Sequence, residues 1–107
     1  MSFNPVTMAN QMISRTSVPL TPVPLVSTVV SAASVRLEWI RAFNSTASDI
    51  LLTLTDGNGN AIAVIVPAAS GGGDGWWGDN IPSGFPMPGG FSVIAGATGL
   101  LLAGSWY

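Results

Sequence analysis

Hydrophobic and polar positions alternate most clearly in the middle of the chain. Two runs rich in aliphatic and β-branched residues, 50–55 and 61–66, are separated by the turn sequence DGNGN at residues 56–60. β-Branched residues favour strands, and Asp, Asn and Gly tolerate the positive φ angles of tight turns. The segment therefore predicts a β-hairpin. In its first strand, Ile50, Leu52 and Leu54 share one face, which we expect to point inward.

The pattern predicts further strands on both sides of this hairpin. Residues 25–32 and 35–43 each favour a strand, with Trp39 expected in the core. Residues 91–95 and 100–107 predict a closing hairpin around a Gly-Ala-Thr-Gly turn. The intervening segment 68–90 is rich in glycine and proline, which favours a long loop or an irregular strand.

Six or seven short strands of this spacing predict an all-β fold. We expect an antiparallel β-sandwich or jelly roll, with a small barrel as the alternative. Residues 1–24 end in the proline-rich stretch PLTPVP and predict an extended N-terminal arm, whereas residues 25–107 form the β-sandwich domain. Met8, Met12 and Ile13 are the apolar residues of this arm that we expect to contact another subunit.

Charge is scarce along the whole chain. Of 107 residues, three are basic and five are acidic, and the chain has no histidine and no cysteine. Nucleic-acid binding requires clustered Lys and Arg, so we expect no nucleic-acid partner. No uninterrupted apolar run is long enough to predict a membrane segment. A hydrophobic share of 48% with so few charges predicts that much of the surface is buried in a multi-copy assembly.

Candidate chemistry is sparse for the same reason. Residues 56–60 resemble the start of a calcium loop, but Ala61 stands where that loop needs Gly and Pro67 where it needs Glu, so we expect no metal site. Asp74 and Asp79 flank two tryptophans, as carboxylates do in glycosidases, yet no feature indicates a raised pKa. We therefore expect neither a cofactor nor catalytic residues, and the chain is predicted not to be an enzyme.

Trp76 and Trp77 are the strongest candidates for partner binding. Tryptophan buries a large area and retains one N–H donor for a partner, which is typical of interface anchors. The same pair could instead stack against a sugar, or pack a loop over the end of a sheet. The role of the surrounding loop, residues 71–80, stays open at this point.

One resemblance extends over residues 35–107. The order of segments is VRLEWIRAFNSTASDILLTLTDGNGNAIAVIVPA, then a glycine-rich stretch, then IPSGFPMPGGFSVIAGATGLLLAGSWY. This order resembles small virion proteins of tailed bacteriophages, in which a strand ending in Asn-Ser/Thr precedes an Asp-Gly hairpin and a closing Gly-Ala-Thr-Gly hairpin. The resemblance implies a β-sandwich or jelly-roll part of a phage particle, with no catalytic residues to carry over.

The resemblance implies a specific role within the particle. We expect a capsid decoration or cement protein, located in the virion, that binds the major capsid protein or another virion protein and stabilises the shell. Such a protein is expected to be a homo-oligomer, with a trimer favoured. A tail, neck or fibre component is the alternative within the particle. A carbohydrate-binding module is the alternative from a different functional class.

Overall fold

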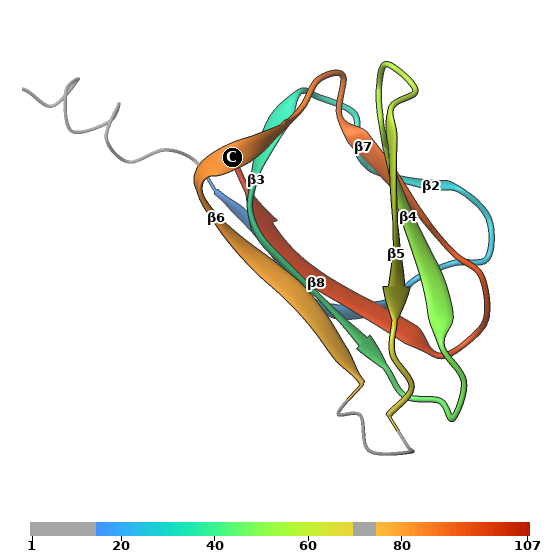
Figure 1. Cartoon of the computed structure of the whole chain (residues 1–107). Helices are drawn as coiled ribbons and strands as arrows, with labels where there is room; N and C mark the ends of the chain where they lie inside the picture. The colour runs from blue at the N-terminus through green and yellow to red at the C-terminus, as the bar shows by residue number, and fades with distance from the viewer. Residues whose placement is uncertain (1–14, 70–74) are drawn as a thin grey trace, which may run out of the picture.

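The computed structural model describes residues 15–69 and 75–107, and in these two ranges the chain forms strands and no helix (Figure 1). The strands are β1 (Thr16–Pro22), β2 (Thr28–Ser31), β3 (Val35–Asn44), β4 (Ile50–Asp56), β5 (Ala61–Val66), β6 (Trp76–Met87), β7 (Phe91–Ala95) and β8 (Leu100–Trp106).

The strands form two four-stranded antiparallel sheets that face each other. One sheet has the order β1-β8-β3-β6 and the other β2-β7-β4-β5 (Figure 1). The pairs are nested: β4 pairs with β5, β3 with β6, β2 with β7 and β1 with β8. Nested pairing of eight strands into two sheets is the jelly-roll topology. The predicted fold class, an antiparallel β-sandwich or jelly roll, is therefore confirmed.

The central hairpin forms where the sequence predicts it. β4 and β5 pair without a register shift from Ile50↔Val66 to Thr55↔Ala61. Gly59 has a φ of 86°, so the turn uses the left-handed conformation that glycine adopts without strain. Ile50, Leu52 and Leu54 are all buried, which confirms the inward face predicted for β4.

The expectation that Trp39 lies in the core is wrong. The register of β3 against both β6 and β8 shifts between Leu37 and Trp39, so the strand carries an irregularity at this point. An extra residue in a strand reverses which side chains point inward. Leu37 is buried before the shift, and Ile40 and Ala42 are buried after it, while Trp39 remains partly exposed on the outer face.

The sandwich begins earlier than the predicted boundary at residue 25. Residues Thr16–Pro22, expected in the N-terminal arm, form β1 and pair with β8. Pro19 and Pro22 are compatible with this strand because β1 lies at a sheet edge, where a missing N–H breaks no ladder. Residues 1–14, the rest of the predicted arm, lie outside the described residues.

Much of the segment expected to be a loop or an irregular strand is the long strand β6. It pairs with β3, and the pairing contains a large register shift between Phe85, opposite Leu37, and Asn80, opposite Trp39. Gly84 lies within this irregular stretch with a φ of 77°. Glycine and proline have low strand propensity, so the sequence does not predict this strand, which forms through its pairing with β3.

The core lies between the two sheets. Ile50, Leu52, Val66 and Leu100 are almost completely buried, and each contributes on the order of 1.5–3 kcal/mol through removal of its side chain from water. At one end, the rings of Phe91 and Trp106 meet edge to face, with centroids 5.2 Å apart and an interplanar angle of 90°.

A buried carboxamide links the sheets at the end of β3. Asn44 is completely buried, and its Nδ2 donates to the Val66 carbonyl at 3.1 Å and to the Ser48 carbonyl at 2.7 Å. Its Oδ1 accepts from the backbone N–H of Thr46 at 2.9 Å and from the Thr46 hydroxyl at 2.7 Å. Since β3 and β5 belong to different sheets, this side chain joins them by a direct hydrogen bond.

We expect Asn44→Ala to lower the free energy of unfolding by about 2–4 kcal/mol, because it leaves buried backbone groups without partners. Urea denaturation followed by circular dichroism measures this loss. The matched control is Ser45→Ala, which removes one exposed hydrogen bond to the Gly99 carbonyl and should change stability by about 1 kcal/mol or less. Equal losses for the two variants would contradict the linking role of Asn44.

Candidate interaction surfaces

The two candidate tryptophans do not form one site. They are successive residues of β6, so their side chains point to opposite faces of the sheet. Trp76 lies on the outer face and is 44% exposed. Trp77 is partly buried and packs against the core between the sheets. Of the other predicted contact residues, Met8, Met12 and Ile13 lie outside the described residues.

Trp76 belongs to an aromatic surface that the sequence pattern only partly reveals. Its ring lies 4.8 Å from that of Phe43, with an interplanar angle of 43°. Trp39, Arg41 and Phe43 alternate along β3 and share this outer face, and Leu101 lies opposite Phe43 on β8. We call Trp39, Arg41, Phe43, Trp76 and Leu101 the aromatic face.

Arg41 lies across a glycine within this face. Its guanidinium carbon is 5.6 Å from the centre of the Trp39 ring, a cation–π contact. Gly78 is opposite Arg41 on β6, and a Cβ atom there would come within 2.8 Å of the Arg41 Cγ. The absence of a side chain at Gly78 therefore gives the Arg41 side chain the room that it occupies. The face combines ring surfaces with a cationic hydrogen-bond donor.

An ion pair lies at the other end of the same sheet. Arg15 Nε donates to both carboxylate oxygens of Glu38, at 3.0 and 2.8 Å, and its guanidinium carbon is 5.4 Å from the centre of the Tyr107 ring. The Ser105 hydroxyl also donates to Glu38, at 3.2 Å. Both charged side chains are partly exposed, so the pair contributes about 1 kcal/mol or less. Its role is to hold the start of β1 against β3 and the end of β8.

The outer face of the other sheet carries no charged residue among those the structure describes. Cross-strand pairs such as Leu51↔Ile65 and Thr53↔Ile94 show which side chains share it. Its most exposed large hydrophobic side chains are Val29 at 64% and Ile65 at 57%. We call it the uncharged face; it consists of Val29, Leu51, Thr53, Thr55, Ala61, Ala63, Ile65, Ser92 and Ile94.

The uncharged face as a unit was not predicted from the sequence. The available signal was that alternate positions in both strands of the central hairpin, 51, 53 and 55 with 61, 63 and 65, contain no charge. Solvent-facing strand positions usually carry polar or charged side chains. This surface can therefore make hydrophobic contacts without removing charged groups from water.

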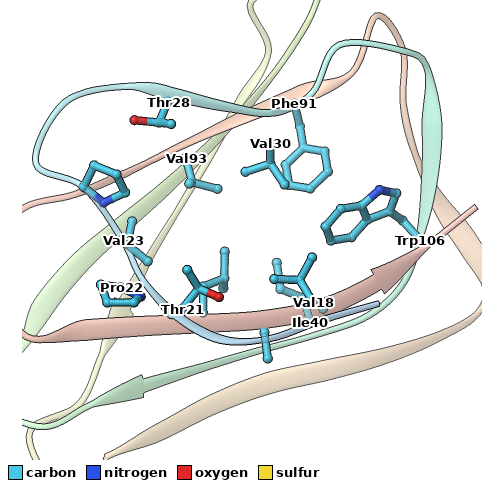
Figure 2. Close-up of a pocket in the computed structure, with 14 residues that line it drawn as sticks. Val18, Thr21, Pro22, Val23, Thr28, Val30, Ile40, Phe91, Val93 and Trp106 are labelled. Carbon is cyan, nitrogen blue, oxygen red and sulfur yellow. The ribbon is translucent and has the colours of Figure 1, made fainter. Parts of the chain in front are cut away.

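An apolar cavity of about 240 Å³ lies between the sheets beneath β1 and β2. Figure 2 shows Val18 and Ile40 on one side, Val30 and Val93 on the other, and Trp106 at one end. The hydroxyls of the two lining threonines, 21 and 28, already donate to the carbonyls of Pro19 and Val26. The cavity therefore suits apolar groups and offers little polar surface to orient a ligand.

Asp56 shapes the turn of the central hairpin. Its Oδ1 accepts from the backbone N–H groups of Asn58 at 2.8 Å and Asn60 at 2.9 Å, and its Oδ2 accepts from Asn60 Nδ2 at 3.2 Å. Desolvation alone would raise the pKa of Asp56, but hydrogen bonds from Asn60, Asn58 and Gly59 together hold the pKa below its ordinary value of 3.8. The carboxylate therefore stabilises the turn by accepting hydrogen bonds from neighbouring turn residues.

Candidate chemistry elsewhere is limited in the part of the chain that the structure describes. No group of three or more acidic side chains lies together there in a way that could hold a metal ion. No helix in those ranges could cross a membrane. Asp74 lies outside the described residues, and the position of Asp79 is defined only by its backbone pairing with Ile40.

Comparisons of the chain with protein-family models, curated proteins and solved structures find no match. The jelly-roll fold and its two outer faces are therefore the observations on which a function can rest.

We expect Asp56 to make stability depend on acid. Because its pKa is lower in the folded state than in the unfolded chain, its stabilising contribution is complete above the unfolded pKa and is lost as the pH falls through the folded pKa. Wild-type protein should therefore lose stability relative to Asp56→Asn below about pH 4, with a constant difference above about pH 5. Urea denaturation of both proteins from about pH 7 to 2.5 measures this, since their other acids cancel. A constant difference over the whole range would contradict the role of Asp56.

Proposed function

We propose that this protein is a structural virion protein that decorates the outside of a capsid shell and holds neighbouring copies of the major capsid protein together. The observation that carries the proposal is the uncharged face on a jelly-roll domain. Large exposed apolar patches on small proteins mark interaction sites more often than free surface. A capsid exterior presents the same partner surface many times, which suits a small domain with one flat contact face.

The sequence resemblance supports this class of function, and the fold is compatible with it. Jelly rolls occur in viral capsid proteins and in lectins, so the fold alone is an analogy and does not select between them. The resemblance to phage virion proteins covers residues 35–107 and includes all strands from β3 to β8. Under this proposal the protein is located in the virion.

Two properties determine how the protein would bind the shell: the scarcity of charge on its contact face and the repetition of the partner surface. Contacts made by uncharged side chains involve little electrostatic attraction, so salt screens them little. Several weak contacts presented together on a repeating shell give high avidity without a strong single site. We expect shell binding to survive about 1 M salt, and release of the protein at moderate salt would oppose the proposal.

Lysine at the centre of the uncharged face should prevent incorporation into particles. We expect the double variant Thr53→Lys/Ile94→Lys to fold, because these side chains point outward, yet to bind shells at least about tenfold more weakly, because a docked lysine loses its hydration. The measurement is the number of copies per purified particle by quantitative mass spectrometry.

A control variant and the copy number of the wild-type protein complete this experiment. Ala47→Lys/Ser48→Lys places the same two added charges on an exposed connection between β3 and β4 and should bind normally. Wild-type copies on the order of hundreds per particle support decoration, whereas about a dozen or fewer would assign the protein to the tail, neck or fibre. Normal incorporation of the double variant would reject the uncharged face as the contact.

A second candidate function, carbohydrate binding, is favoured by the aromatic face. Trp76 is exposed beside Phe43, and Arg41 supplies hydrogen-bond donors nearby. Sugars stack their apolar face on aromatic rings while charged groups bind their hydroxyls.

If this second function holds, Trp76→Ala should abolish binding to a glycan on a broad array while circular dichroism stays unchanged. The matched control is Phe85→Ala, which removes another exposed ring of β6 at 38% exposure outside the aromatic face. The absence of any bound glycan with wild-type protein would reject this candidate.

A further inference from the structure

The edge strands of the two sheets are not equally protected against pairing with other strands. Among the described strands, the edges are β1 and β6 in one sheet and β2 and β5 in the other. β1 and β6 each contain two prolines and a register shift. β2 is four residues long and also shifts register. Prolines, irregularities and short length are the devices by which natural sheets block edge-to-edge association.

β5 has none of these devices. Its sequence, AIAVIV, contains no charge and no proline, and it pairs with β4 in one continuous register. It lies at the open edge of its sheet beside β4 (Figure 1). An apolar edge strand of regular geometry is a template for another strand.

Exposed side chains on β5 lie on both faces of the strand. Ile62 is 40% exposed and Ile65 is 57% exposed, and because their positions differ by an odd number they point to opposite faces. A partner lying flat on the uncharged face would cover Ile65 and leave Ile62 in water. A strand added beside β5 covers both.

The backbone of β5 also has groups directed away from β4. The Asp56 N–H donates to the Asn60 carbonyl at 2.9 Å, which makes this pair hydrogen-bonded. Hydrogen-bonded and non-hydrogen-bonded pairs alternate in an antiparallel ladder, so the N–H and C=O groups of Ala61, Ala63 and Ile65 face away from β4. In the described ranges, no other strand lies on that side of β5.

We propose that β5 pairs antiparallel with β5 of a second copy of this chain, about a two-fold axis at Ala63. In this register Ala63 lies opposite Ala63 of the partner subunit, and each Ala61 lies opposite an Ile65, so a small side chain meets a large one. The outward-facing backbone groups of these residues meet in hydrogen-bonded pairs, giving about six new backbone bonds. The two sheets that contain β5 become one continuous sheet.

The occupant is a second copy because β5 is complementary to itself in this register. When the strand runs antiparallel to its own sequence in this register, Ala61 meets Ile65 on one face and Ile62 meets Val64 on the other, and no like charges approach each other along it. A two-fold contact joins copies in pairs, so it does not by itself build the trimer expected for a decoration protein. The proposal is independent of whether the protein decorates a capsid.

Introducing a charge at residue 63 tests this register directly. Because each Ala63 faces its own equivalent, Ala63→Lys or Ala63→Glu alone places like charges directly opposite each other and should weaken dimers by about tenfold or more. An equimolar mixture of the two variants should restore dimers as a mixed pair. Size-exclusion chromatography with light scattering across a dilution series measures the masses, and native mass spectrometry identifies the mixed pair.

Further variants separate edge pairing from docking through the face. Ala63→Pro removes an N–H that β4 does not use and should yield a folded monomer by circular dichroism, whereas Ala63→Val keeps the N–H and should remain a dimer. Leu51→Lys changes the uncharged face beside β5 without changing the edge and should leave the dimer intact.

Several results would overturn the proposal. They are a wild-type monomer at every concentration tested, a trimer insensitive to Ala63→Pro, a dimer lost in Leu51→Lys but kept in Ala63→Pro, and a failure of the Lys and Glu variants to form mixed dimers. Failure of the intact wild-type dimer to bind shells would instead oppose only the proposed decoration function.

Discussion

The hydrogen bond from the Asn44 carboxamide to the Val66 carbonyl joins the two sheets of this protein at one end. Asn44 is completely buried, so each of its polar atoms needs a partner within the protein, and the connection from β3 to β4 is shaped to supply them. The hydrophobic attraction between two apolar sheets has no directional preference, whereas the hydrogen bonds of a buried carboxamide require a defined geometry. The relative position of β3 and β5, and with it the orientation of both outer faces, depends on this side chain.

Charge poverty has different consequences on the two outer faces. The aromatic face keeps a cation, Arg41, which lies over Gly78 and contacts the Trp39 ring. The uncharged face has only small, hydroxyl and aliphatic side chains, so its interactions depend on area and shape. A flat face of this kind has low specificity in a single contact but becomes selective when a repeated partner surface presents many contacts in a fixed arrangement.

Only part of the candidate site could be predicted from the sequence. Trp76 lies on an outer surface, as an interface anchor would, but Trp77 turns toward the core because neighbouring strand residues alternate. The uncharged face combines residues from four strands, and its members become neighbours only when β7 pairs with β4 and with β2. Local sequence contains no record of those partners, since they are far apart along the chain.

By itself the sequence determined the β class, the central hairpin and the inward face of β4, because turn chemistry and side-chain alternation act between neighbouring residues. The tertiary structure alone decided that Thr16–Pro22 joins β8, that a glycine- and proline-rich segment becomes β6, and that Trp39 faces outward. Each of these depends on hydrogen bonds to a distant strand, which can hold a segment of weak strand propensity in place and can shift its register by a residue. Long-range pairing therefore overrides local preference where the two differ.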